Sequence, residues 1–140
     1  MMEKIEKKVT INASAEKVWK ALTDKNELKE WMLMPTTFEP VVGKEFTFKA
    51  ESSEKWDGLI HCAVKEVEVN RKLVYTWNPG INAETLVTIM ISEKEGQTEL
   101  ILVHTGWEKL PAEMRPQLIE GHSKGWDERF VKKLSELLSK

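Results

Sequence analysis

Three histidines and one cysteine are the residues best suited to acid–base, nucleophilic or metal chemistry in this chain: His61, Cys62, His104 and His122. A Cys–His catalytic pair requires the thiol within hydrogen-bond reach of the imidazole. His61 and Cys62 are neighbours in a segment with strand periodicity, so their side chains point to opposite faces. No ligand spacing supports a zinc site from Cys62, His104 and His122, and the chain contains neither H-E-x-x-H nor C-x-x-C. We therefore predict no catalytic residue and no metal.

His104 and His122 are better explained as polar groups in an apolar environment. In a strand-like segment His104 shares a face with Leu102, because alternate residues of a strand point the same way. His122 precedes Trp126 by four residues and Phe130 by eight, so the three share a helical stripe. Each imidazole is either a core group bonded to a backbone carbonyl or a cavity group that hydrogen-bonds a ligand. The sequence leaves both interpretations open.

Aromatic side chains are the other conspicuous feature, with six tryptophans against one tyrosine. Two strand-like segments carry them at alternate positions, Phe46 with Phe48 and Tyr75 with Trp77, so that each pair shares one face. Facing inward, these rings line either a solid core or a binding pocket, and the sequence does not distinguish the two. The residues predicted to contact a ligand are Trp31, Phe46, Phe48, Tyr75, Trp77, Leu102, His104, His122, Gly125, Trp126 and Phe130.

Hydrophobic periodicity indicates which elements hold these residues. Residues 5–11 are predicted to form a strand, and two short helices follow, capped by Ser14 and by Thr23 or Asp24. The period then changes to two in five further segments with no helix between them, which is typical of an antiparallel meander. These segments are residues 41–50, 59–69, 72–77, 84–92 and 97–106.

The last segment returns to a helical period. Apolar residues recur every three or four positions and Pro116 suits the first turn, which predicts one helix of about 24 residues, about 36 Å long. Its apolar stripe must be covered, and the meander is the only large partner. The pattern therefore favours an α+β fold, with a curved antiparallel sheet around this C-terminal helix. The stripe consists of Leu118, His122, Trp126, Phe130, Leu134 and Leu137 or Leu138.

Gly121 and Gly125 lie one turn apart in this helix, although each glycine in a helix interior costs about 0.5–1 kcal/mol relative to alanine. Their missing side chains would let the sheet or a ligand approach the helix backbone. Alternatively, they accommodate bulky neighbours such as Trp77 or Trp107. Both interpretations stay open at this stage.

Composition narrows the class of protein. With 140 residues, 41% hydrophobic and 31% charged, the chain is expected to form one domain over residues 1–140. The net charge of −2 argues against nucleic acid, which requires a basic surface. The chain has no run of about 18 apolar residues for membrane insertion and no secretory signal pattern, and its single cysteine fits a reducing compartment. We expect a cytoplasmic protein, as a monomer or weak homodimer.

Several motifs together resemble a known family. They are "VWKALT" followed by a tryptophan, then "GKEFTF", "LVYTW", "HTGW" and a final "GW" before the last apolar residues. In this order, from about Val9 to Leu138, they resemble the activator of Hsp-90 ATPase homologue family of the START-like (Bet v 1-like) helix-grip superfamily. The resemblance implies two short helices after the first strand and a cavity between the sheet and the C-terminal helix. Elsewhere in the superfamily such cavities hold lipids, polyketides and other hydrophobic molecules.

Three functions follow as hypotheses. The first is a START-like domain that binds a small hydrophobic molecule in that cavity, with no catalysis and no cofactor. The second, which rests on the resemblance alone, is a protein that modulates the ATPase of a chaperone (Hsp-90). The third is a cyclase- or hydrolase-type enzyme, as some superfamily members are, with His104 or His122 as general acid or base. A carboxylate within reach of either imidazole would favour the third hypothesis.

Overall fold

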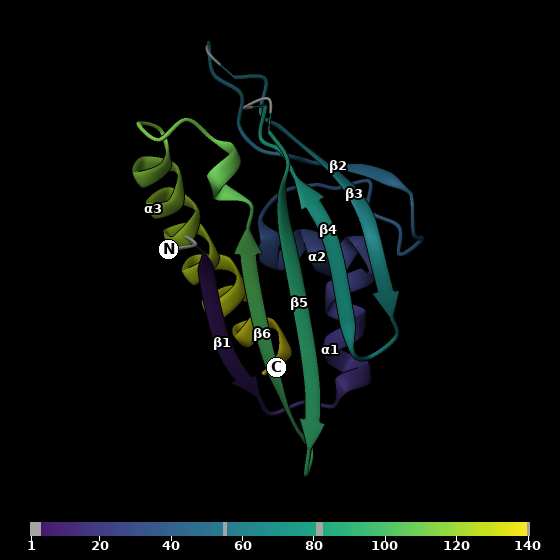
Figure 1. Ribbon diagram of the computed structural model, residues 1–140. Helices are drawn as coiled ribbons and strands as arrows, with labels where there is room; N and C mark the ends of the chain where they lie inside the picture. Colours follow the sequence, from purple (N-terminus) through teal and green to yellow (C-terminus); the bar gives the residue numbers. More distant parts are fainter. Residues whose placement is uncertain (1–3, 55, 81–82, 140) are drawn as a thin grey trace.

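The structure is a computed structural model that describes residues 4–54, 56–80 and 83–139, so the two ends of the expected domain 1–140 lie outside the described residues. An antiparallel sheet and two groups of helices make up the described chain (Figure 1). The elements are β1 (Ile5–Ile11), α1 (Ala15–Thr23), α2 (Lys25–Met32), β2 (Glu45–Lys49), β3 (Leu59–Glu68), β4 (Lys72–Trp77), β5 (Thr85–Lys94), β6 (Gln97–Thr105), η1 (Trp107–Lys109), α3 (Arg115–Trp126), η2 (Asp127–Lys133) and α4 (Leu134–Leu138).

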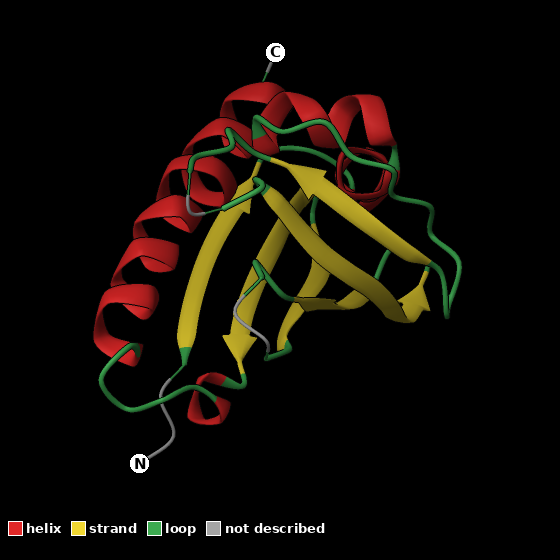
Figure 2. Cartoon of the chain, turned by 90° about the horizontal axis from the view of Figure 1, so that it is seen from above, coloured by secondary structure: helices red, strands yellow, loops and turns green. Residues whose placement is uncertain are grey.

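Six strands of the described chain form one sheet in the order β1-β6-β5-β4-β3-β2. The strands β2 to β6 pair with their neighbours in sequence, and β1 lies on the far side of β6, with Ile5 opposite His104. A register shift between Val64 and Glu66 marks a bulge in β3, which bends the strand. The sheet curves toward the helices (Figure 2). The predicted α+β class, the antiparallel meander and the two short helices after the first strand are confirmed.

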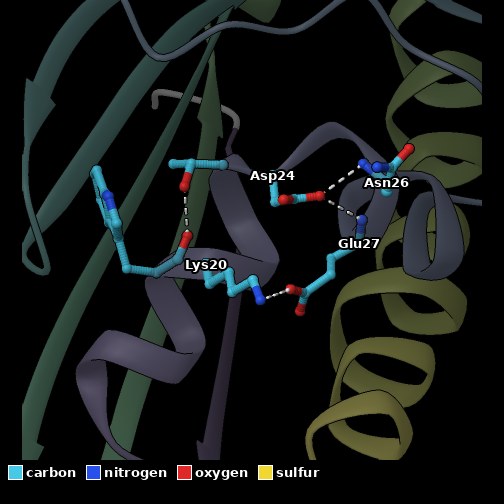
Figure 3. A network of polar contacts seen from close by, with 6 residues as sticks. Lys20, Asp24, Asn26 and Glu27 are labelled. Carbon is cyan, nitrogen blue, oxygen red and sulfur yellow. Dashed lines mark hydrogen bonds and ion pairs between the residues drawn. The ribbon is translucent and has the colours of Figure 1, made fainter.

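Asp24 ends the first short helix and begins the second. Its backbone N–H donates to the Lys20 carbonyl at the end of α1, and its carboxylate accepts from the backbone N–H groups of Asn26 (2.9 Å) and Glu27 (3.2 Å). The Lys20 ammonium also lies 3.4 Å from the Glu27 carboxylate, across the same corner (Figure 3). Of the two caps that the sequence allowed, Asp24 caps α2, and Thr23 donates its hydroxyl back into α1. A cap of this kind contributes about 1 kcal/mol to helix stability.

The C-terminal helix is continuous from Arg115 to Leu138, as predicted, but its middle segment η2 is a π-helix. The apolar stripe repeats every four residues, whereas an α-helix repeats every 3.6, so each step of four drifts by about 40° around an α-helix. The wider π turns absorb part of this drift. Trp126, Phe130 and Leu134 therefore stay buried on one side, together with Leu138.

This helix packs between β1 and the pair of short helices (Figure 2). The Trp31 ring of α2 meets the Phe130 ring edge-on at 6.2 Å between centroids, and its indole N–H donates to the Ala21 carbonyl at 2.8 Å. Trp31 thus joins α1, α2 and the C-terminal helix into one core. No helix in the described ranges is both long enough and apolar enough to cross a membrane.

Candidate ligand-binding cavity

A cavity of about 520 Å³ lies beside the first half of the C-terminal helix. One wall is formed by α3 and the start of η2, and the other by the end of β4, the start of β3 and the chain before it. The volume falls within the range of roughly 300–1,000 Å³ that is typical of small-molecule sites. The lining residues are Met34, Ala50, Trp56, Ile60, Trp77, Pro79, Gly80, Gln117, Leu118, Gly121, His122, Trp126 and Arg129.

Three of the residues predicted to contact a ligand line this cavity: Trp77, His122 and Trp126. Gly125 lies on the same helix but outside the lining. The other seven are buried in the packed interior between the sheet and the helices. These seven are Trp31, Phe46, Phe48, Tyr75, Leu102, His104 and Phe130.

The inward-facing aromatic rings form a solid cluster rather than a second cavity wall. Phe38, Phe46, Phe48 and Tyr75 pack in edge-on or tilted pairs, with ring centroids 4.9–6.5 Å apart, a separation that is typical of stabilising aromatic pairs. The ring centroids of Trp77 and Phe48 are 5.6 Å apart, so Trp77 packs against this cluster and also lines the cavity. Position along β4 therefore distinguishes core from cavity, with Tyr75 in the core and Trp77 at the wall.

The Tyr75 hydroxyl is buried and has no hydrogen-bond partner in the described part of the chain. Burial raises the pKa of this phenol, and the nearby Cys62 raises it further, so the group stays neutral. An unpaired buried polar group costs about 1–3 kcal/mol. We therefore expect Tyr75→Phe to raise the free energy of unfolding by about 1 kcal/mol in urea denaturation, whereas Tyr75→Leu, which also removes the ring, should lower it. A loss of stability in Tyr75→Phe would show that the hydroxyl is bonded.

His104 is a fully buried core histidine whose two ring nitrogens are both bonded. The Thr85 hydroxyl donates to the Trp77 carbonyl (2.7 Å), so it accepts from Nε2–H of His104 (2.7 Å). Nδ1 of His104 accepts from the Trp126 indole N–H (3.1 Å). Burial, followed by the nearby His122, lowers the pKa of His104 to about 2. The imidazole is therefore neutral and has no free lone pair. His104 is thus a core residue, as one of the two interpretations expected, but its ring bonds to two side chains and not to a backbone carbonyl.

His122 lines the cavity with one nitrogen already bonded. Nδ1 donates to the Leu118 carbonyl one turn earlier (2.8 Å), so Nε2 carries the lone pair of the neutral ring. Burial lowers the pKa of His122, the bond to Leu118 opposes this effect, and the charge of Arg129 lowers the pKa further. The described residues that line the cavity include no Asp or Glu, so none of them offers the His122 imidazole a carboxylate partner.

Residues 121–125 read GHSKG, which matches the G-x-S-x-G spacing of a hydrolase nucleophile elbow. An elbow requires a sharp turn between a strand and a helix, whereas these residues lie inside α3. The Ser123 hydroxyl accepts from the Lys7 ammonium (2.9 Å), which also pairs with Asp127 (2.9 Å). Ser123 therefore ties the helix to the edge strand β1 and is not placed as a nucleophile.

Gly121 and Gly125 have different surroundings. A methyl group added at Gly121 would meet no neighbouring group within 4 Å, and Gly121 lines the cavity. The same addition at Gly125 would lie 3.1 Å from Nη1 of Arg129, with no atom of the sheet, Trp77 or Trp107 within 4 Å. Close packing of these glycines against the sheet or those tryptophans is therefore wrong. Gly121 leaves space open, and Gly125 makes room for a guanidinium.

Sequence reasoning missed Trp56, Gln117 and Arg129 as cavity residues. Trp56 is half-buried in the cavity wall. Gln117 and Arg129 could have been found, because Gln117 lies four residues before Gly121 and Arg129 lies four residues after Gly125, on a helix whose residues four apart share a face. Trp56 carried no such signal, since only the folded loop between β2 and β3 brings it to the helix.

The curved sheet, the long C-terminal helix and the two short helices define a helix-grip protein of the START-like (Bet v 1-like) class. Within this class, the chain belongs to the family of activator of Hsp90 ATPase homolog 1-like proteins, whose family model matches residues 12–139. The resemblance inferred from the sequence motifs is confirmed.

Solved structures of similar proteins support the same assignment. Protein MLL2253 from Mesorhizobium loti is 30% identical, with a TM-score of 0.82 over 98% of this chain and 97% of its own. Protein BH1534 from Bacillus halodurans is 25% identical, with a TM-score of 0.77 over 99% of each chain. PFC0360w, an HSP90 activator from Plasmodium falciparum, is 22% identical, with a TM-score of 0.78 over 99% of this chain and 97% of its own, and shares the fold. A search of curated protein sequences finds no match.

Proposed function

We propose that this protein binds a small, largely apolar molecule in the cavity beside its C-terminal helix, without catalysis. The observation that carries the proposal is the cavity of about 520 Å³ itself, walled mainly by aliphatic and aromatic side chains. Small-molecule sites typically combine such walls with a few polar groups that orient the ligand. Gly121 supports the proposal, because a side chain at this position would project into free space.

Two indole groups of the wall contribute their ring faces rather than their N–H groups. The Nε1–H groups of Trp56 and Trp77 are buried and have no hydrogen-bond partner among the described residues. An unpaired buried donor costs about 1–3 kcal/mol. Neither N–H group is exposed on the surface of the cavity, so these donors lie behind its wall and the free space is bounded mainly by apolar atoms.

A hydrolase or cyclase activity has less support. His104 has no free nitrogen, and His122 has no carboxylate in the cavity wall to orient it. Across the described part of the chain, no cluster of three or more His, Cys, Asp or Glu could hold a metal ion. General acid–base catalysis would thus depend on His122 alone.

Modulation of a chaperone is the second candidate function. It is favoured by membership of a family that is described by Hsp90 activation, and by the likeness to the Plasmodium HSP90 activator. Family membership alone is a weak argument for activity, because one fold serves many functions. ATP turnover by Hsp90, measured with and without this protein, tests the candidate, and an unchanged turnover would rule it out.

The binding proposal predicts saturable, one-to-one binding of the neutral dye N-phenyl-1-naphthylamine, with a dissociation constant in roughly the micromolar range for a ligand of this size. Because Trp56, Trp77 and Trp126 line the cavity, dye binding should also quench tryptophan emission. Native mass spectrometry of freshly purified protein would show whether a cellular molecule is retained. A linear, unsaturable dye response, with no retained molecule, would contradict the proposal.

A further inference from the structure

Among the described residues that line the cavity, Arg129 carries the one formal charge. Arg129 brings a guanidinium, and the lining contains no acidic side chain. His122 is neutral and brings one lone pair, on Nε2. The wall is therefore positively charged at one end and suited to a ligand group that accepts hydrogen bonds.

Arg129 is held in this wall without a counter-ion. Its side chain forms no hydrogen bond and no ion pair with any residue in the described ranges. The carboxylate that acts electrostatically on Arg129 is that of Glu128, the preceding residue, and its side chain is exposed to solvent. Burial lowers the pKa of Arg129, although the charge of Glu128 opposes this effect. A guanidinium that is partly removed from water and unpaired is unfavourable until an anion meets it.

The helix is shaped to accommodate this group. Gly125 lies one turn before Arg129, and a methyl group at Gly125 would lie 3.1 Å from Nη1. The absence of a side chain at Gly125 thus gives the guanidinium its place against the helix. The charge of Arg129 also lowers the pKa of His122, which lies seven residues earlier on the helix and lines the same cavity. Both groups therefore face the same space.

We infer that the ligand of this cavity is an amphipathic monocarboxylic acid, whose carboxylate pairs with Arg129 while its apolar body lies against Trp77, Trp126 and the aliphatic wall. The inference rests on the proposed binding function and specifies its ligand class. A planar guanidinium suits a carboxylate, because two parallel N–H groups can bind its two oxygens. A single fixed positive charge in the wall matches a monoanion, whereas a doubly charged phosphate would keep one charge uncompensated.

Displacement of bound N-phenyl-1-naphthylamine by dodecanoate and by methyl dodecanoate tests the inference, at concentrations below micelle formation. The two competitors share a hydrocarbon chain and differ in charge. The wild-type protein is expected to bind the acid at least about tenfold more tightly than the ester. In Arg129→Met this ratio should fall to about one, and in Arg129→Lys it should be intermediate, because lysine keeps the charge without the paired N–H groups. Lys132→Met, which removes an exposed cation from the same helix, should keep the wild-type ratio.

The outcomes separate the two proposals. If the dye binds but the wild-type protein does not prefer the acid, the ligand class is wrong and the binding function stands. A preference that persists in Arg129→Met would also overturn the inference, because another group would then bind the carboxylate. If the dye does not bind at all, the binding function and the ligand class both fail. Should Arg129→Met not fold, the wild-type ratio and Arg129→Lys still decide the question.

Discussion

Lowering the pH from 6.5 to 4.5 is expected to reduce the free energy of unfolding by about 2 kcal/mol through His104 alone. In the folded protein this imidazole is fully buried and neutral, with a pKa near 2 in place of the ordinary 6.5. In the unfolded chain it takes up a proton below pH 6.5. The unfolded state therefore binds more protons than the folded state throughout this interval, and stability falls as the pH falls.

The size of the effect follows from proton linkage. One extra proton bound by the unfolded state changes stability by about 1.4 kcal/mol per pH unit. The contribution of His104 is complete above pH 6.5 and is lost progressively down to its folded pKa of about 2. Burial lowers the pKa of His122 as well, so this residue acts in the same direction.

Urea denaturation at a series of pH values, on the wild-type protein and on His104→Gln, measures this contribution. Glutamine stays neutral in both states, so between pH 6.5 and 4.5 the free energy of unfolding should depend less steeply on pH, by about 1 kcal/mol per pH unit on average. The free energy of unfolding of His104→Gln at pH 7 should be about 1–3 kcal/mol lower than that of the wild-type protein, because the hydrogen bonds to Thr85 and Trp126 are disturbed. His61→Gln, at an exposed position of β3, keeps His104 and should keep the slope. An equal slope in the wild-type protein and His104→Gln would show that His104 is protonated in the folded state.

Local patterns predicted the elements of this fold well, because each pattern has a short-range cause. Asp24 caps a helix wherever its carboxylate can reach the first free N–H groups, and the sequence alone placed it within one residue. The change of period from four to two separated helices from strands. The π segment was not predicted, although the four-residue repeat of the apolar stripe contained its signal.

The candidate site was less predictable, because core and cavity residues share the same pattern. Tyr75 and Trp77 occupy equivalent inward positions of β4, and only their distance from the end of the strand separates core from wall. Trp56 reaches the cavity through a loop whose course has no periodicity. The charge of Arg129 predicts a surface position, because charged residues are mostly surface residues. Only the folded helix shows that its guanidinium lies beside Gly125 and lines the cavity.

Gly121→Trp is expected to weaken binding of N-phenyl-1-naphthylamine by about 100-fold while leaving the fold intact. The new side chain would enter the cavity that Gly121 lines, where an added methyl group meets no neighbouring group within 4 Å. Displacing the equivalent of about four buried CH₂ groups of a ligand costs about 3 kcal/mol, which is about 100-fold in the dissociation constant. Replacing a glycine in a helix interior also removes its conformational cost, so the free energy of unfolding should change by no more than about 1 kcal/mol.

A matched control separates cavity filling from the general effect of a new tryptophan. Glu120→Trp places the same side chain on the neighbouring position, which is exposed, lies outside the lining and pairs only at the surface with Lys124 (3.1 Å). Loss of such a surface pair costs less than about 1 kcal/mol, so this variant should bind the dye as the wild-type protein does. Equal affinities in Gly121→Trp and Glu120→Trp would mean that the dye binds elsewhere. A loss of binding confined to Gly121→Trp, with both variants equally stable in urea, would locate the ligand in the space that the glycine keeps open.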